Sequence, residues 1–213
     1  MKSCIAMAGC VAMAFIPTLA QATVWDLAAD FSTTQNPNGA WSYGWRPSPV
    51  DPLVLYTDHE YPCPLAVWVE DFSLWCPNVV QNPYDYPVDC CTWVLDPHKV
   101  LFHPGPAQQS VVRWTAPGEL DVTVTTHFRS IDIGGKIVYV YVNGVQVYTA
   151  TLEGLETTGD YAASIIVHGG DVVECAVSPI SFYYDSTQLE FVLVSGPVPA
   201  VERTFGQVKA LFR

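Results

Sequence analysis

The dipeptide Asn143-Gly144 separates two runs of apolar and aromatic residues, and this arrangement limits the possible folds more than any other short pattern in the chain. One run is Ile137 to Val142, and the other is Val145 to Tyr148. Asn-Gly favours a two-residue hairpin turn because both central positions of that turn require positive φ. We therefore predict an antiparallel hairpin over residues 137–148.

The same alternation of strands and turns extends from residue 99 to the end of the apolar sequence. Leu120, Val122 and Val124 fall on one face of a strand with a period of two residues. Further strands are expected at 110–114, 163–167, 172–177 and 187–194. Many short strands without a helical period predict an all-β fold, an antiparallel two-sheet jelly-roll sandwich.

The sandwich domain is expected to cover residues 23–195, with an unusual segment inside it. Residues 47–97 are rich in Pro, Trp, Tyr and Cys, and we expect a long disulfide-stapled loop insertion there rather than a second domain. Residues 196–213 are expected to form a linker and a short C-terminal tail, which is either a frayed terminus or a signal for export or surface attachment.

Residues 1–22 have the composition of a secretory signal peptide. A lysine precedes an apolar stretch, and the segment ends in Ala20-Gln21-Ala22. A membrane anchor and a lipoprotein box around Cys10 are the alternatives. No later stretch is long and apolar enough to span a bilayer. We therefore expect a secreted protein that is extracellular or at the cell surface.

Acidic residues outnumber basic ones, and this balance limits the possible partners. The chain has 21 Asp and Glu against 9 Lys and Arg, for a formal net charge of −12. Nucleic acids and anionic membranes bind basic surfaces, so neither is expected as a partner.

The cysteines outside the leader point to disulfides rather than to a metal. Four of the five lie in the insertion, in an oxidising compartment where disulfides persist. We expect up to two bridges, with Cys63 to Cys76 the easiest to close, although sequence does not determine the pairing. The spacings do not match zinc sites. The four are Cys63, Cys76, Cys90 and Cys91, and Cys175 is expected to be buried in a strand.

Several short motifs occur in a recognisable order. They are Ala29-Asp30-Phe31-Ser32, 36–44 (NPNGAWSYG), His103-Pro104-Gly105, 110–117 (SVVRWTAP) and Tyr184-Asp185-Ser186-Thr187. This ordered set resembles a group of secreted bacterial proteins, common in planctomycete-like genomes, whose domain is similar to galactose-binding-like carbohydrate-binding modules. The resemblance implies a jelly roll, a non-catalytic role and a glycan ligand. It does not cover the insertion between Tyr61 and Trp93.

Modules of this kind commonly hold a structural Ca²⁺ between their first and last strands, and a hard cation requires several oxygen ligands. Asp30 lies at the end of the strand that we expect to open the domain, and Asp185 lies just before the last expected strand, at 187–194. The expected ligands are Asp30, Asn36, Asn38 and Asp185. The alternative is that these residues cap turns through their own backbone.

Aromatic residues of the insertion are the candidates for ligand contact. Sugars stack their C–H faces on aromatic rings while polar groups bind the hydroxyls. The candidates are Trp68, Trp75, Tyr84, Tyr86 and Trp93. The alternative is a small core beneath the stapled loop. Trp41, Trp45 and Trp114 lie beside strands and are assigned mainly to the core.

The sequence offers no strong catalytic pattern. No motif singles out a carboxylate pair for glycoside hydrolysis, and the five histidines are scattered. Ser110 lacks the surroundings of a nucleophile elbow. We therefore expect a secreted non-catalytic module that binds an extracellular glycan or cell-surface polymer. The alternative function is a structural or cell-surface protein that self-associates and is attached through its C-terminal tail.

Overall fold

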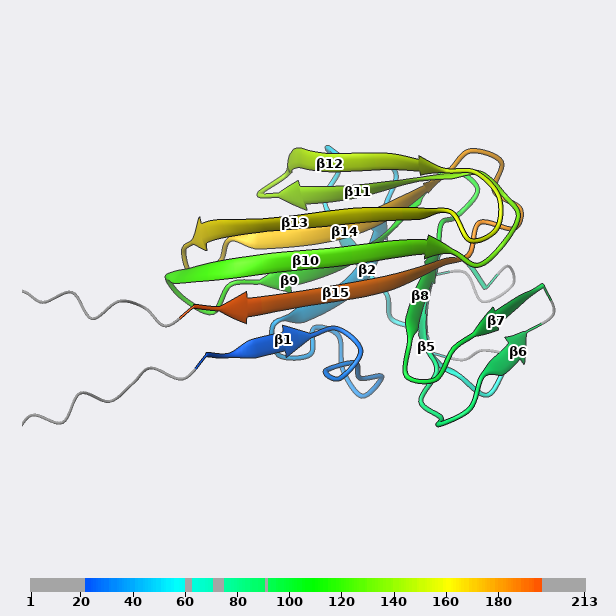
Figure 1. Cartoon of the computed structure of the whole chain (residues 1–213), viewed down its shortest axis with the longest axis horizontal. Coiled ribbons are helices and arrows are strands. Elements are labelled where there is room, and N and C mark those ends of the chain that lie inside the picture. Colours follow the sequence, from blue (N-terminus) through cyan, green and yellow to red (C-terminus); the bar gives the residue numbers. More distant parts are fainter. Residues whose placement is uncertain (1–21, 60–62, 71–74, 91, 197–213) are drawn as a thin grey trace, which may run out of the picture.

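The computed structural model describes residues 22–59, 63–70, 75–90 and 92–196. The predicted signal peptide, except Ala22, and the predicted tail, except Gly196, lie outside these residues. All named elements in the described part are strands, and they form two large antiparallel sheets and one separate hairpin (Figure 1). No helix in this part is long and apolar enough to cross a membrane.

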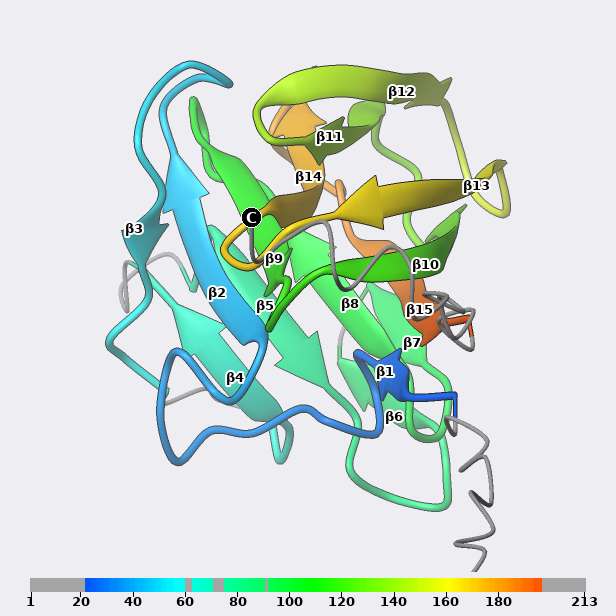
Figure 2. The same ribbon diagram turned by 90° about the vertical axis from the view of Figure 1, so that its left-hand side faces the viewer.

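Sheet A contains seven strands. In spatial order they are β13 (Thr158–Val167), β10 (Leu120–Ser130), β15 (Thr187–Ser195), β8 (Val100–His103), β5 (Asn78–Gln81) and β4 (Ala66–Val69), with β1 (Val24–Asp26) also paired to β15. Sheet B contains β12 (Val145–Leu152), β11 (Lys136–Val142), β14 (Val172–Pro179), β9 (Gln109–Thr115), β2 (Trp41–Arg46) and β3 (Val54–Leu55). In a second view, β11 and β12 of sheet B lie above β13 and β10 of sheet A (Figure 2).

These sheets confirm the predicted two-sheet jelly-roll sandwich and the positions of its later strands. The predicted hairpin is the pair β11–β12, and Asn143 and Gly144 have φ values of 50° and 77° at its turn. The turn at Gly169-Gly170 joins β13 to β14, which belong to different sheets. The chain therefore crosses from sheet A to sheet B at that turn.

The core between the sheets is built from large aromatic and β-branched side chains. Trp41 on β2 lies opposite Trp114 on β9, and both are almost fully buried. Trp41 packs edge-on against Phe191 of sheet A at 5.2 Å between ring centroids. Burying one large apolar side chain contributes roughly 1.5–3 kcal/mol, so these contacts hold the two sheets together. Trp45 is half-buried at the margin of the same core.

The insertion differs from its predicted loop form. It supplies β4 and β5, which extend sheet A beyond β8, and a hairpin of β6 (Val88–Cys90) and β7 (Trp93–Leu95). A second cluster of buried side chains lies beneath this hairpin, and it includes Val67, Val80 and Leu101 together with Trp93. These strands have only three or four residues, which is too short to show an alternating pattern. The Pro and Cys residues that flank them favoured the prediction of a loop.

The disulfide of the insertion joins Cys63 to Cys90, with 6.4 Å between their Cα atoms. The expected Cys63–Cys76 pairing is therefore wrong. Cys76 is buried just before β5, whereas Cys63 packs against the cluster beneath the β6–β7 hairpin, where Cys90 ends β6. Cys91 lies outside the described residues. Cys175 is fully buried in β14, as predicted.

Replacing both Cys63 and Cys90 by Ala is expected to destabilise the domain. The bridge links residues 27 positions apart, and in the chain-entropy model closing such a loop raises the free energy of the unfolded chain by about 3.5 kcal/mol. Urea unfolding of the double variant measures this loss. An unfolding midpoint equal to that of the native chain would contradict the role of the bridge.

Candidate functional site

A cleft rich in aromatic residues opens where the insertion meets the β14–β15 loop. Its volume is about 330 Å³, and we call it the aromatic cleft. It is bounded by the segment before β5, the start of β7, the end of β8 and the loops after β10 and β14. The lining residues include Trp75, Trp93, Phe182, Tyr183 and Tyr184, with the polar Asn78, Thr92, His103, Asp132 and Ser186.

Three of these aromatic side chains are open to solvent. Tyr183 is 70% exposed, Tyr184 47% and Trp75 39%. Trp93, at 9%, belongs to the cluster beneath the β6–β7 hairpin and contributes to the wall of the cleft. Phe182 packs against Tyr183 at 5.1 Å between ring centroids. The exposed rings offer flat apolar surface of the kind on which a sugar ring stacks.

The backbone around the cleft is held in an uncommon conformation. Trp75, Phe182 and Tyr184 have φ values of 52°, 69° and 65°, in the left-handed region. Bulky side chains rarely adopt this region, and each such residue costs roughly 1–3 kcal/mol. Strain of this kind persists where the surrounding structure fixes the backbone, and it concentrates at binding sites. Three strained aromatic residues around one cleft therefore mark it as a candidate site.

Two polar atoms at the cleft are buried without a partner in the described part of the chain. They are Oδ1 of Asn78 and Oγ of Ser186. The Asn78 side chain is held in place because its Nδ2 donates to the Trp75 carbonyl. A buried unpaired polar group costs about 1–3 kcal/mol, so a ligand hydroxyl that reaches either atom through a small shift of the lining side chains would be favoured.

His103 and Asp132 provide the imidazole and the carboxylate among the described lining residues of the cleft. Nδ1 of His103 donates to the Pro104 carbonyl at 2.7 Å, and Nε2 accepts from the Asp185 amide at 3.4 Å. Burial lowers the pKa of His103, so its imidazole is neutral. The Asp132 carboxylate accepts from Thr92 Oγ1 at 3.2 Å and from the Ile133 amide at 2.9 Å. Asp132 thereby ties the β6–β7 hairpin to the loop after β10.

Two buried ionisable side chains, Lys136 and Asp185, lie next to the loop of residues 182–184. Lys136 Nζ donates to Ser130 Oγ at 2.6 Å and to the Tyr184 carbonyl at 3.5 Å. Burial lowers the pKa of Lys136 to about 8, against the opposing effect of Asp185. Burial also raises the pKa of Asp185 to about 6, and the Lys136 charge partly offsets this. The Lys136 contact with Tyr184 holds the loop that carries the exposed rings.

Gly134 permits the close approach of that loop to the β10–β11 turn. A Cβ at this position would lie 2.3 Å from the Tyr183 carbonyl oxygen and 2.4 Å from Oδ1 of Asp185. Any other residue would displace the backbone of the loop.

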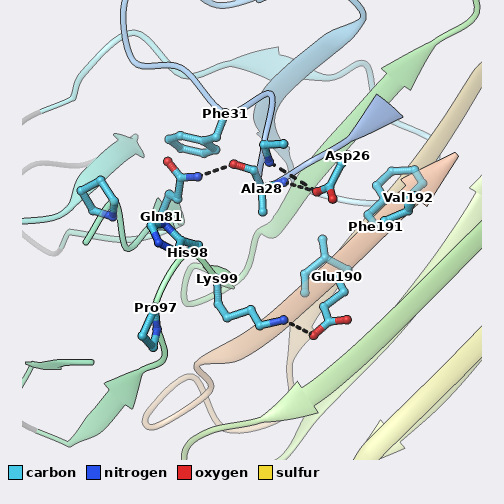
Figure 3. A pocket seen from close by; sticks show the side chains of 13 residues that line it. Asp26, Ala28, Phe31, Gln81, Pro97, His98, Lys99, Glu190, Phe191 and Val192 are labelled. Carbon is cyan, nitrogen blue, oxygen red and sulfur yellow. Dashed lines mark hydrogen bonds and ion pairs between the residues drawn. The ribbon is translucent and has the colours of Figure 1, made fainter. Parts of the chain in front are cut away.

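Another cleft, larger than the aromatic cleft, lies beside β1 and has a volume of about 590 Å³ (Figure 3). Its charged groups are already engaged: Lys99 Nζ pairs with Glu190 Oε1 at 2.6 Å, and Asp26 Oδ1 accepts from the Ala28 amide at 2.9 Å. Two phenylalanine rings, Phe31 and Phe191, are among its lining residues, and Phe191 is almost fully buried in the core. This cleft therefore offers less stacking surface than the aromatic cleft.

The structure brings together two of the five aromatic residues that the sequence proposed, Trp75 and Trp93. Trp68 is 4% exposed, and its Nε1 donates to the Ser32 carbonyl at 2.7 Å, so it belongs to the core. Tyr84 and Tyr86 stack on each other at 5.0 Å between β5 and β6 and do not line the aromatic cleft. They do not form a row with the tryptophans.

Sequence reasoning missed the three aromatic residues 182–184. They lie in the short segment before the last strand. A turn cannot direct three consecutive rings into the core, so this run of three aromatic residues was a signal in the sequence that some of them are exposed.

The four expected calcium ligands are not gathered at one place. Oδ2 of Asp30 accepts from Trp41 Nε1 at 3.0 Å, and Asn38 Nδ2 donates to the Asp30 carbonyl at 2.9 Å. The Asn36 side chain bonds the backbone of Tyr43 and Tyr56, which fixes the corner before β2. Asp185 lies with Lys136 instead.

These residues therefore do not fit a shared calcium site. No group of three or more His, Cys, Asp or Glu side chains elsewhere in the described chain is placed to hold a metal ion.

No protein-family model and no curated protein matches the chain. Solved structures with a similar arrangement include a CBM51 module from a Clostridium perfringens GH95 protein in complex with methyl-galactose. It is 10% identical, with a TM-score of 0.42, over 81% of this chain and 99% of that one.

Two CBM36 modules are also similar. One, from a multidomain xylanase of the Trinervitermes trinervoides hindgut metagenome, is 14% identical with a TM-score of 0.34, over 55% of this chain and 95% of its own. The other, in complex with calcium and xylotriose, is 15% identical with a TM-score of 0.33, over 54% and 96%. With TM-scores below 0.5, these likenesses carry no conclusion about a ligand.

Replacing Asp185 by Asn is expected to change how stability depends on pH. The Asp185 carboxyl has a pKa of about 6 in the folded protein, against 3.8 for the ordinary group. Between pH 6 and 3.8 the folded chain therefore binds a proton at this carboxyl more readily than the unfolded chain does. The native chain should therefore gain stability relative to the variant as the pH falls from 7 to 4, by up to about 3 kcal/mol. Urea unfolding across this range measures the difference.

Asp121→Asn, at an exposed position of β10, is the matched control and should follow the native profile. Parallel profiles for the native chain and Asp185→Asn would contradict the prediction.

Proposed function

We propose that this protein is a non-catalytic binding module that holds carbohydrate in the aromatic cleft. The observation that carries the proposal is the combination of exposed rings and unpartnered polar atoms in one cleft. Trp75, Tyr183 and Tyr184 provide stacking faces, while Asn78 Oδ1 and Ser186 Oγ lie at the same site. Sugar recognition requires both an apolar face and fixed hydrogen-bonding groups.

The electrostatics of the chain favour an uncharged ligand. The formal net charge is −12, and the carboxylate of Asp132 is the one charged group among the described residues of the cleft. Burial keeps His103 neutral. A polyanion would meet repulsion from the whole protein and find no cation in the cleft.

The cleft is better suited to binding than to hydrolysis. Glycoside hydrolysis in most families uses two carboxyl groups on either side of the scissile bond, about 5–10 Å apart. Asp132 is the one carboxylate that the described lining residues provide, and two hydrogen bonds already fix it. Its geometry supports a role in positioning the hairpin.

The proposal includes secretion and a location outside the cytoplasm. The leader-like residues 1–22 support it, and the Cys63–Cys90 disulfide is of the kind that persists in oxidising compartments. The resemblance to secreted planctomycete-like proteins is part of the same proposal. Calcium is not part of this proposal, because Asp185 lies beside Lys136 rather than with Asp30, Asn36 and Asn38. In the alternative function the sandwich mediates self-association, and attachment depends on the tail, which lies outside the described residues apart from Gly196.

Replacing Tyr183 by Ala is expected to weaken binding to neutral polysaccharides about tenfold, because it removes an exposed stacking ring. Affinity electrophoresis against cellulose derivatives, xylan, mannan and galactan identifies a ligand, and isothermal titration measures the loss.

Tyr86→Ala is the matched control. It removes the same side chain from a position that is 56% exposed but outside the cleft, and should bind like the native chain. Equal losses in both variants, or no binding to any polysaccharide, would reject the proposed site. Release of reducing sugar would reject the non-catalytic assignment.

A further inference from the structure

A second cleft lies on the other side of the β6–β7 hairpin. Its volume is about 420 Å³, and we call it the Arg129 cleft. Thr92 and Trp93 line both this cleft and the aromatic cleft. Ile131 and Asp132, which are adjacent in the chain, line one cleft each. The two clefts therefore flank the same short segment of the hairpin.

Arg129 provides a fixed hydrogen-bond donor in this second cleft. Its Nη2 donates to Asp96 Oδ2 at 2.7 Å, and its Nη1 to Glu156 Oε2 at 3.3 Å. These contacts hold the guanidinium in place. Its Nε is buried and has no partner in the part of the chain that the structure describes. The Arg129 side chain as a whole is 25% exposed, so a ligand acceptor would meet the accessible part of the guanidinium rather than this buried N–H group.

The rest of the Arg129 cleft combines apolar surface with hydrogen-bond acceptors. Val94 is 47% exposed and Leu155 56% exposed, and both line the cleft. The exposed carboxylate of Asp89 adds an acceptor that Arg129 does not bind. Carboxylates accept hydrogen bonds from hydroxyl groups, while the apolar side chains suit the C–H face of a ring.

Backbone strain occurs here as it does in the aromatic cleft. Glu156 has a φ of 62°, in the left-handed region, and its carboxylate is one of the groups that hold Arg129. A strained residue that fixes a binding group is a feature of preorganised sites. The two clefts thus share both a wall and this type of local conformation.

The charge of the Arg129 cleft limits the class of sugar that fits it. The cleft is lined by three carboxylates, from Asp89, Asp96 and Glu156, and by one guanidinium, from Arg129. Uronic acids would meet a net negative surface on a protein whose formal charge is already −12. Neutral sugars can use the acceptors without this penalty.

We propose that the Arg129 cleft is a second subsite for the same ligand, so that the protein binds a neutral oligosaccharide chain that passes over Thr92 and Trp93. This inference rests on the proposed function of the aromatic cleft. It specifies that the ligand is a chain of several sugar units. It also assigns Asp89, Arg129 and Leu155 to the recognition of this chain.

Chain-length dependence tests the proposal. Cello-, xylo- and manno-oligosaccharides of two to six units are titrated into the native protein and into Asp89→Ala and Leu155→Ala. For the saccharide series that binds, native affinity should rise about tenfold or more with length, because longer chains fill both clefts. Both variants should lose about fivefold to tenfold for six units and nothing for two units.

Asp121→Ala is the matched control, because Asp121 is exposed near the opposite end of β10 from Arg129. It should bind all chains like the native protein. Tyr183→Ala, in contrast, should weaken binding at every length. Oligogalacturonates of the same lengths should bind at least tenfold more weakly than the neutral chains.

The outcomes separate the two proposals. Binding that is equal for two and six units, or unchanged in Asp89→Ala and Leu155→Ala, would overturn the second subsite and leave the aromatic cleft in place. Preferential binding of oligogalacturonates would overturn the assignment to neutral sugars. If no saccharide binds at any length, the proposed function fails, and the second subsite fails with it.

Discussion

Trp41 and Trp114 face each other across the β2–β9 pair and fill the space between the two sheets. Trp25 packs edge-on against Trp114 at 5.2 Å, and Phe191 packs against Trp41 at the same distance. These contacts connect sheet B to β1 and β15 of sheet A. This packing holds together the two sheets from which the loops of both clefts extend.

The loops that form the aromatic cleft are held from below by polar contacts. Lys136 bonds the Tyr184 carbonyl, Asp132 bonds Thr92, and the close approach at Gly134 leaves no room for a side chain. Ionic groups buried at this depth are favourable only when other groups compensate for lost hydration. Their presence beneath strained aromatic residues indicates that the conformation of the loop is fixed at the expense of stability.

The strands of the sandwich were largely predictable, whereas the site was predictable in part. Period-two alternation and the Asn143-Gly144 turn act over a few residues, so they identified β10, β11, β12 and β15. The strands of the insertion are too short to show a period-two pattern. Nothing in the neighbouring residues indicates that Trp75 is exposed whereas Trp68 is buried. The Cys63–Cys90 bridge likewise depends on where the β6–β7 hairpin packs.

The sequence by itself determined the all-β class, the hairpin at residues 137–148, the acidic surface and the concentration of cysteines and aromatic rings in one segment, because each follows from composition or from neighbouring residues. Tertiary structure decided the rest. It joined Trp75, Trp93 and residues 182–184 around one cleft and separated Asp30 from Asp185. Residues about 100 positions apart meet only when two sheets pack, and that packing depends on the whole core rather than on any short stretch.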